Sequence, residues 1–530
     1  MRTIVLGPPG TGKTTTLLNK VDDYLKNTDP DKVGYFAFTQ KAAYEARDRA
    51  IKKFNLTEDD LPYFRTLHSL AFRKLGIKKD QVMQQRHYKD LGKKLGFPVT
   101  YADYQEDQGS AFNSDSEYLR IIQLAQLRNI TSEQQFDLHE HTQDLERSTL
   151  RIINLAKLRN ITIDLQFNLG EHNQDVEYDK LNIIANELDR YKKEYNLIDF
   201  NDMILDFVKS DKSPRFDVVF IDEAQDLSLM QWDMTRSIWN KTKDSFIAGD
   251  DDQAIFRWAG ADVDSFITQT GKMLHLTQSM RIPKKVHDFA MKIIERVSNR
   301  IYKEWKPKTV EGSVRMYESF EDVDLSKGEW MVLTRTRHML EAIEETLTTK
   351  GLYFENKFKK SFEKDIQDAA IDWHNLLKGQ LLNYRQLENI SKYMGPSHWH
   401  KKKMKGMVKE AFYGIDQLVK DYGLQIKLNW FEAFNDCSTD RKEYIRAMRR
   451  NGESLKENPR IQLSTIHSVK GGEKQNVVLL TDLTHNTNKA YEKNPDDENR
   501  LFYVGATRTK ENLHVIQPKD DYKSFQIGDL

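Results

Sequence analysis

A glycine-rich segment near the start of the chain has the residue types and spacing that bind a phosphate group. It reads Gly-Pro-Pro-Gly-Thr-Gly-Lys-Thr over residues 7–14 and directly follows the apolar run 3–6. Glycines let backbone N–H groups approach a phosphate, and a helix beginning after the segment adds a favourable dipole. We expect Lys13 to reach the β- and γ-phosphates of a nucleotide and the Thr14 hydroxyl to coordinate Mg²⁺. The expected phosphate-contacting residues are Gly7, Pro8, Pro9, Gly10, Thr11, Gly12, Lys13, Thr14 and Thr15.

A pair of acidic residues closes a second apolar run. Asp222 and Glu223 follow residues 218–221, which have the pattern of a buried strand. A carboxylate at a strand end beside a phosphate loop can hold Mg²⁺, and a second carboxylate can polarise the attacking water. We therefore expect Asp222 to be a metal ligand and Glu223 to be the general base. Without the phosphate loop, such a pair would more often be a solvated loop.

Two regions alternate short apolar strands with helical patterns, as parallel sheets covered by helices do. The expected strands of the first region are 3–6, 35–39, 218–221 and 245–248. Those of the second region are 331–334, 460–465, 477–480 and 514–517. We therefore expect two α/β cores, each interrupted by a mainly helical insertion. The expected ranges are 1–75 and 199–270 for the first core, 76–198 for the first insertion, 271–350 and 456–530 for the second core, and 351–455 for the second insertion.

The first insertion contains a tandem duplication. The sequence LRIIQLAQLRNIT at 119–131 returns as LRIINLAKLRNIT at 150–162, an offset of 31 residues that continues through the following segment. The two copies, 119–149 and 150–180, predict a helical unit that was inserted whole. A chain that lacks 150–180 should then fold, because one complete copy remains. The competing view is that both copies share one core, so that the deletion would expose apolar faces.

Composition limits the class of protein. Lys and Arg total 81, as do Asp and Glu, so a nucleic-acid surface would have to be a local basic patch. Cys437 is the only cysteine, which excludes an internal disulfide and a cysteine-based metal cluster. No apolar stretch is long enough to cross a membrane, and from the residues at the start of the chain we expect no signal peptide. We expect a soluble, cytoplasmic protein.

Seven short segments occur in the order found in a known family. They are 38–43, 66–69, 222–226, 249–262, 278–281, 465–473 and 498–508. With the phosphate loop, these segments resemble the motifs of the UvrD/Rep/PcrA family of superfamily 1 DNA helicases. The resemblance covers both cores and is weak in the two insertions. It implies an α/β fold with two RecA-like parallel-sheet P-loop cores.

The resemblance also implies roles for individual residues. Gln253 would sense the γ-phosphate, and Glu473 would contact the ribose. Arg281 and Arg508 would reach the γ-phosphate from the second core, as arginine fingers do. The implied catalytic residues are Lys13, Asp222, Glu223, Gln253, Arg281 and Arg508. The implied DNA-binding residues are Phe38, Thr39, His68, Phe256, Trp258, Thr465 and His467.

Phe256 and Trp258 would stack on bases of a single strand, a contact that tolerates any sequence. Their alternative role is that of plain core aromatics. For each arginine the alternative is a surface ion pair.

The chain departs from the family pattern at several points. We expect the upstream glutamine motif that recognises adenine to be absent, and Met280 stands where an aromatic residue usually precedes the arginine. We therefore expect GTP or dATP to support activity as well. Ala259 stands where the family often has Arg, and we expect no nuclease domain after Arg508.

These features predict an ATP- and Mg²⁺-dependent translocase on single-stranded DNA that unwinds partly duplex DNA with 3′→5′ polarity. One alternative is a DNA-dependent ATPase that strips proteins from DNA without processive unwinding. A more distant one is a P-loop ATPase that acts on a protein.

Two further clusters give weaker signals. Residues 398–405 interleave basic and aromatic side chains, which could contact duplex DNA or simply form a solvated face. The pairs Glu140-His141 and Glu171-His172 lack further ligands at fixed spacing, so we do not expect a metal site there.

Overall fold

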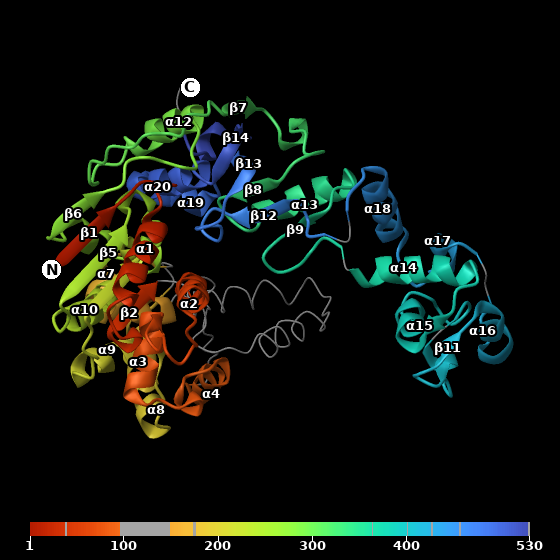
Figure 1. The fold of residues 1–530 in the computed structure, drawn as a ribbon, viewed down its shortest axis with the longest axis horizontal. Coiled ribbons are helices and arrows are strands. Elements are labelled where there is room, and N and C mark those ends of the chain that lie inside the picture. Colours follow the sequence, from red (N-terminus) through yellow and green to blue (C-terminus); the bar gives the residue numbers. More distant parts are fainter. Residues whose placement is uncertain are drawn as a thin grey trace. The chain divides into compact units, whose positions relative to one another are not determined.

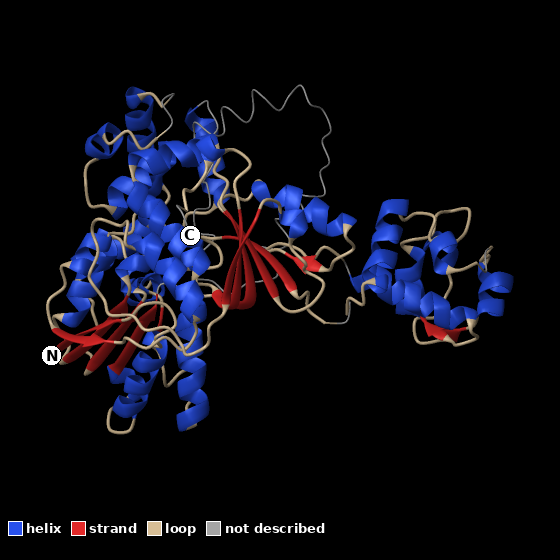
Figure 2. Ribbon diagram, turned by 90° about the horizontal axis from the view of Figure 1, so that it is seen from above, coloured by secondary structure: helices blue, strands red, loops and turns tan. Residues whose placement is uncertain are grey.

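The computed structural model describes residues 1–37, 40–95, 149–172, 176–362, 364–399, 401–425, 428–454 and 457–527. Contacts divide the chain into two units. The first unit is Met1–Val310 with Asn494–Val504, and the second is Glu311–Lys493 with Gly505–Leu530. Each unit contains a six-stranded sheet flanked by helices (Figures 1 and 2). Among the described residues, no helix is both long and apolar enough to cross a membrane.

The sheet of the first unit is entirely parallel, in the order β3-β2-β4-β5-β1-β6. Its strands are β1 (Arg2–Leu6), β2 (Val33–Ala37), β3 (Phe64–Arg65), β4 (Val218–Asp222), β5 (Asp244–Gly249) and β6 (Lys272–His275). Alternate residues of one strand enter different cores, as Phe220 and Ile221 of β4 do. Because both faces are covered, β2 and β4 are buried along their whole length.

The helices of the first unit divide between the two faces of this sheet. α1 (Lys13–Leu25) and α2 (Gln40–Phe54) contribute to one hydrophobic core. α3 (Leu67–Leu75), α9 (Phe200–Ser210) and α10 (Leu229–Trp239) contribute to the other. Shorter or outlying helices are α4 (Gln85–Leu95), α7 (Ile163–Asn168), α8 (Tyr178–Glu194), α11 (Val263–Ile267) and α12 (Lys284–Ile294). The predicted strands 3–6, 218–221 and 245–248 correspond to β1, β4 and β5.

The first unit extends further along the chain than the sequence predicts. The expected boundary was at residue 270, but β6 pairs with β1 in the first sheet, and the unit continues to Val310. β6 is an edge strand whose residues are largely exposed, so it lacks the apolar pattern that identifies buried strands. Residues 494–504, most of α20 (Pro495–Ala506), also belong to this unit.

The second copy of the duplication is an integral part of the first unit, whereas most of the first copy lies outside the described residues. Residues 149–158 are helical, and Leu150, Ile152 and Ile153 are buried with side chains of α4 and α8. The Lys157 ammonium lies 3.0 Å from Asp199 Oδ2 and 2.8 Å from Asp202 Oδ1. Lys192 contacts the same two carboxylates. Apolar packing and a buried ion cluster therefore both hold this copy in place.

The sheet of the second unit is also entirely parallel, in the order β7-β14-β13-β8-β12-β9. Its strands are β7 (Ser313–Tyr317), β8 (Trp330–Thr334), β9 (Phe354–Glu355), β12 (Ile461–Thr465), β13 (Lys474–Leu480) and β14 (Thr509–Ile516). Its helices outside the insertion are α13 (Met339–Thr349) and α19 (His485–Lys493). The prediction of a second α/β core with a parallel sheet is confirmed. The two edge strands, β7 and β9, were not predicted.

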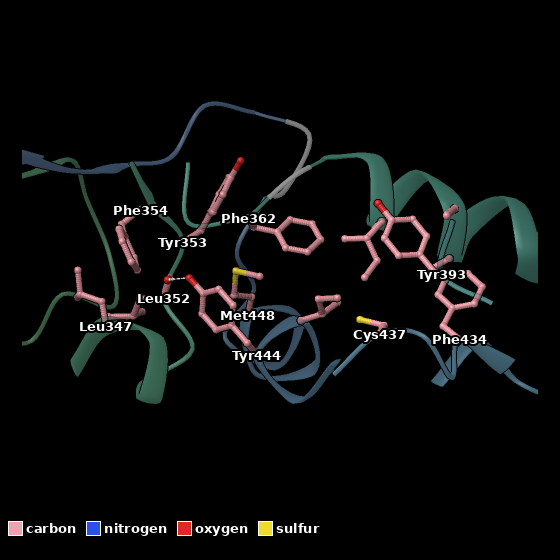
Figure 3. Close-up of a cluster of buried hydrophobic side chains, with 14 of the residues drawn as sticks. Leu347, Leu352, Tyr353, Phe354, Phe362, Tyr393, Phe434, Cys437, Tyr444 and Met448 are labelled. Atoms are coloured by element: carbon pink, nitrogen blue, oxygen red, sulfur yellow. Dashed lines mark hydrogen bonds between the residues drawn. The ribbon is translucent and has the colours of Figure 1, made fainter. Parts of the chain in front are cut away.

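The second insertion is mainly helical and shares one hydrophobic cluster with the second sheet. Its elements are α14 (Lys364–Leu377), β10 (Leu382–Asn383), α15 (Tyr384–Ser391), β11 (Phe412–Tyr413), α16 (Ile415–Tyr422), α17 (Trp430–Ala433) and α18 (Thr439–Arg450). Figure 3 shows part of this cluster, in which the Tyr444 hydroxyl donates to the Leu352 carbonyl at 2.6 Å. Within the basic and aromatic segment 398–405, Trp399 and Met404 are buried, and Lys401–Lys403 are exposed. His400 lies outside the described residues.

Two deletions test which copy of the duplication the fold requires. Removal of 119–149 or of 150–180 leaves one copy at the same place in the chain. Removal of 150–180 puts Gln126 at the position of Lys157, because the offset is 31 residues. We expect both products to fold. The chain that lacks 150–180 should be less stable by about 1–3 kcal/mol, because the carboxylates of Asp199 and Asp202 lose the Lys157 ammonium. Urea denaturation measures the difference.

The substitution Gln126→Lys in the chain that lacks 150–180 is the matched rescue. It should restore most of the lost stability, because it returns an ammonium to Asp199 and Asp202. Equal stability of the two single-copy chains would contradict the expectation. So would aggregation of both products, which is the outcome expected if the two copies share one core.

Candidate active site

The phosphate loop connects β1 to α1 and has the backbone geometry that its glycines allow. Gly10 and Gly12 have φ angles of 75° and 82°, in the left-handed region that favours glycine. A Cβ atom on Gly7 would lie 2.4 Å from Thr11 Oγ1. The Lys13 ammonium donates to the Gly7 carbonyl at 2.7 Å, which holds it across the loop. Gly12 is the N-cap of α1 and has no side chain to bond the first N–H groups of the helix, which suits them to an anion.

Residues 279–281 pack directly against this loop. The buried Ser279 hydroxyl donates to the Pro9 carbonyl at 3.0 Å, and the Met280 N–H donates to the Gly10 carbonyl at 2.8 Å. A Cβ on Gly10 would lie 2.7 Å from Arg281 Cβ. Arg281 is therefore beside the phosphate loop within the first unit, whereas the sequence predicted that it would come from the second core. The Met280 side chain is 78% exposed.

Asp222 ends β4 next to the phosphate loop, with its carboxylate held on both oxygens. Oδ2 accepts a hydrogen bond from Thr14 Oγ1 at 2.8 Å and another from the Tyr35 hydroxyl at 2.9 Å. Oδ1 accepts from the Glu223 N–H at 3.0 Å. Burial, and then the negative charge of Glu223, raise the pKa of Asp222 to about 6. A bound cation would pair with the carboxylate and offset the free-energy cost of burying its negative charge.

The Thr14 hydroxyl and the Asp222 carboxylate fit a magnesium ion. Both groups are oxygen donors, which Mg²⁺ prefers, and they already touch each other. Among the described residues, the buried carboxylate accepts hydrogen bonds from two hydroxyls and one N–H, and its pKa is raised. The contact between the two groups is compatible with the predicted metal ligands Thr14 and Asp222, and their role stays a prediction.

Glu223 lies at the turn after β4, where its φ of 53° is uncommon for a residue other than glycine. Gln225 Nε2 donates to Glu223 Oε2 at 2.5 Å, and Gln225 Oε1 accepts from the Asp250 N–H at 3.0 Å. The buried Gln225 amide thus joins the candidate base to the end of β5. Such a bond fixes where the Glu223 carboxylate lies without removing its charge.

Three consecutive aspartates follow β5, and all three are buried. The Lys303 ammonium contacts Asp250, Asp251 and Asp252, and its side chain is only 2% exposed. Gln253 Nε2 donates to Asp250 Oδ2 at 2.6 Å. Burial opposes the ionisation of Asp250, but the charges of Lys303 and Lys13 outweigh it and lower the pKa of this carboxyl. The candidate sensor Gln253 therefore lies on an anionic cluster whose charge Lys303 partly offsets.

Arg300 and Arg500 complete this cluster. Arg300 makes a bidentate contact with Asp252, at 2.8 Å and 2.6 Å. Arg500 Nε donates to the Asp251 carbonyl at 3.0 Å. The sequence did not identify Lys303 or Arg300 as part of the site, and it gave Gln225 only as a member of the motif 222–226. The available signal was the run of three aspartates after a buried strand, because buried carboxylates require cationic partners.

The candidate DNA-contacting aromatics differ in exposure. Phe256 is 5% exposed and so is buried, whereas Trp258 is 37% exposed. The loop that carries Trp258 is backed by the helix 149–158. A Cβ on Gly260 would lie 3.0 Å from Leu158 Cβ, and Arg151 Nη2 donates to the Trp258 carbonyl at 3.4 Å. The second copy of the duplication therefore supports this loop.

His68 is near the start of α3, and its ring meets Phe200 edge-on at 5.9 Å. Burial lowers the pKa of His68 to about 4, so the imidazole is neutral at pH 7. A neutral ring can still donate a hydrogen bond to a phosphate, but it adds no charge to a DNA-binding surface. Phe38 and Thr39 lie outside the described residues.

The second unit brings its own candidate residues together around β12, β13 and β14. Arg508 is 2% exposed, and its Nη1 donates to the Gly472 carbonyl at 3.4 Å. The adjacent Glu473 is exposed and pairs with Lys510 at 2.8 Å. Thr465 Oγ1 donates to Ser468 Oγ at 3.0 Å, and His467 lies half-buried in the same turn.

The second Glu-His pair of the sequence lies in the first unit. Glu171 forms an ion pair with Arg159, and the His172 ring stacks on Phe167.

Comparisons with known proteins agree with the geometry of the first unit. The model of the UvrD/REP helicase N-terminal domain matches residues 1–273. The ATP-dependent DNA helicase Rep of Buchnera aphidicola is 25% identical over 294 residues, which cover 49% of this chain and 37% of that protein. The ATP-dependent DNA helicase PcrA of Staphylococcus epidermidis is 21% identical over 407 residues, which cover 69% and 50%.

The similarity to PcrA of Staphylococcus aureus extends over more of the chain. It is 20% identical over 478 residues, which cover 82% of this chain and 58% of that protein. In all three comparisons the match spans less than two thirds of the relative's own length. The family model itself covers more than half of the chain. From its phosphate loop, its acidic strand end and this match, the chain belongs to the UvrD/REP helicase family.

Proposed function

We propose that this chain is an ATP-dependent motor that translocates on single-stranded DNA in the 3′→5′ direction and unwinds duplexes. The observation that carries the proposal is the hydrogen-bonded path between the candidate hydrolysis site and the candidate sensor. It runs from Glu223 through Gln225 to Asp250 and Gln253. Trp258 is exposed on the same segment only five residues after Gln253. The names of the relatives, ATP-dependent DNA helicases, support the same function.

Lys13 and the N–H groups at the start of α1 would bind the nucleotide phosphates. Thr14 and Asp222 would hold Mg²⁺, which supplies charge neutralisation to the phosphoryl group when it is bound. Glu223 would accept a proton from the attacking water. Gln225 keeps the Glu223 carboxylate in place, which matters because proton transfer requires contact at hydrogen-bond distance.

Gln253 would report the state of the γ-phosphate to the DNA. Its amide bonds to Asp250, so a change in its partner would move the segment that continues to Trp258. Stacking of one base on an aromatic ring contributes roughly 1–3 kcal/mol. Arg281 and Arg508 would complete the phosphate site, and Glu473 would contact the ribose. Thr465, His467 and His68 would line the path of the strand.

Three substitutions separate binding from hydrolysis. Lys13→Ala should weaken nucleotide binding and abolish turnover, because it removes the ammonium from the loop. Glu223→Gln should bind nucleotide with normal affinity but not hydrolyse it. Arg508→Ala should lower the rate by on the order of 10³–10⁵ if Arg508 acts as an arginine finger. Fluorescent nucleotide titration measures binding, and a steady-state ATPase assay measures turnover. Near-normal turnover of Arg508→Ala would contradict the proposal that Arg508 contributes to the phosphate site.

Substitutions of Trp258 and Phe256 should have different effects. Trp258→Ala should keep basal ATPase and thermal stability but lose most of the stimulation by single-stranded DNA, because the exposed ring is the stacking surface. Phe256→Ala should cost about 3–5 kcal/mol of folding stability, as large-to-small substitutions of buried aromatics do. Urea denaturation and DNA-titrated ATPase assays distinguish them. Normal DNA stimulation of a folded Trp258→Ala protein would contradict the assignment.

Polarity and unwinding need a substrate assay. We expect a partial duplex with a 3′ single-stranded tail to be unwound and one with a 5′ tail to remain intact. A preference for the 5′ tail would overturn the polarity. Displacement of a bound protein without separation of either duplex would instead support the non-unwinding ATPase as the function.

A further inference from the structure

Tyr35 places a phenol hydroxyl on the carboxylate assigned to the metal, although it lies outside the sequence motifs. The residue is in the middle of β2 and is fully buried, at 0% exposure. Its hydroxyl oxygen lies 2.9 Å from Asp222 Oδ2. A buried hydroxyl that donates to a carboxylate makes a charge-assisted hydrogen bond, which is stronger than a bond between neutral groups.

The register of the sheet explains how this side chain reaches Asp222. β2 and β4 are parallel neighbours, with Tyr35 opposite Phe220 and Ala37 opposite Asp222. Residues two apart in a strand share a face, so all four side chains lie on the same side of the sheet. The small Ala37 leaves space beside Asp222, and the Tyr35 ring extends along the strand into that space.

Aromatic packing determines the direction of the hydroxyl. The Tyr35 ring stacks on Phe64 with a centroid distance of 5.8 Å and an interplanar angle of 14°. It also stacks on Phe220 at 6.4 Å and 27°. Rotation of the ring out of this stack would leave a buried hydroxyl without a partner, which is costly. Its hydroxyl is therefore presented to Asp222 in one orientation.

The hydroxyl completes the set of donors around the Asp222 carboxylate. Oδ2 accepts from both Thr14 and Tyr35, and Oδ1 accepts from the Glu223 N–H. An ionised carboxylate has about four lone-pair sites, and three are used here. Three donors from three different elements fix the plane of the carboxylate against rotation. The Tyr35 donor comes from β2, a strand that supplies none of the other site residues that the structure describes.

We propose that Tyr35 is a positioning residue for the metal. Its hydroxyl holds Asp222 in the orientation in which this carboxylate and the Thr14 hydroxyl together receive the Mg²⁺ of a bound nucleotide. The inference rests on the proposed function, because it requires a nucleotide at the phosphate loop. Tyr35 acts through Asp222 and does not itself touch the nucleotide.

The test is Tyr35→Phe, which keeps the ring and its stacking and removes one oxygen atom. Affinity for fluorescent N-methylanthraniloyl-ADP is measured in MgCl₂ and in EDTA. In the unmodified protein, Mg²⁺ should strengthen binding. In Tyr35→Phe this gain should be smaller by roughly tenfold, the size expected for a hydrogen bond to a charged group. Affinity in EDTA should stay unchanged, and a higher MgCl₂ concentration should be needed for half-maximal binding.

Tyr24→Phe is the matched control. Tyr24 donates its hydroxyl to Asp244 Oδ2 at 2.9 Å in the same unit, so the substitution removes the same kind of bond outside the phosphate site. It should leave the effect of Mg²⁺ on affinity intact. In an Asp222→Asn background, Tyr35→Phe should have no additional effect, because its role depends on that carboxylate.

The ratio of affinities with and without Mg²⁺ cancels any loss of folded protein that is common to both conditions. An unchanged ratio in Tyr35→Phe would overturn the proposal. An equal weakening in MgCl₂ and EDTA would overturn it too, because the effect would then be on the fold or on the nucleotide itself. If the unmodified protein bound no nucleotide at all, the proposed function would fail together with this inference.

Discussion

The hydrogen bond from Thr14 to Asp222 is the contact on which the candidate site depends. It joins residues 208 positions apart, at 2.8 Å, and brings together the phosphate loop after β1 and the acidic end of β4. In the sheet these two strands are separated only by β5, and all three are parallel, so their carboxyl ends lie on the same edge. Open α/β sheets bind ligands at that edge. The first insertion can therefore occupy more than a hundred residues of the intervening chain without disturbing the site.

Charge is the second constraint, because the site concentrates carboxylates in a buried region. Asp222 and Glu223 adjoin each other, and Asp250–Asp252 follow the neighbouring strand. The second group has cationic partners within the protein, Lys303 and Arg300. Removal of one partner from a buried ion pair typically costs about 3–5 kcal/mol, so Lys303 is essential to the cluster that holds Gln253. Within the described part of the chain, Asp222 instead accepts only from hydroxyl and N–H donors, which suits a carboxylate that pairs with a bound cation.

Much of this arrangement could be predicted from the amino-acid sequence, for a physical reason. Buried parallel strands are continuous apolar runs, so β1, β4, β5, β8, β12 and β13 could be recognised, and the phosphate loop has an unusual composition. Edge strands such as β6, β7 and β9 are short or exposed and lack that signal. For this reason the first unit was predicted to end before β6. Lys303 and Tyr35 were missed because each acts across the fold, and nothing near either residue in the sequence marks its carboxylate partners.

The central claim is that nucleotide hydrolysis in this chain is coupled to single-stranded DNA. The most direct measurement is the steady-state ATPase rate at saturating ATP and Mg²⁺, without DNA and with increasing concentrations of an unstructured oligonucleotide. We predict a low basal rate that rises to a plateau with the oligonucleotide. We also predict that blunt duplex DNA of the same length stimulates hydrolysis much less. A rate that single-stranded DNA leaves unchanged would contradict the account and would instead support an ATPase that acts on another kind of partner.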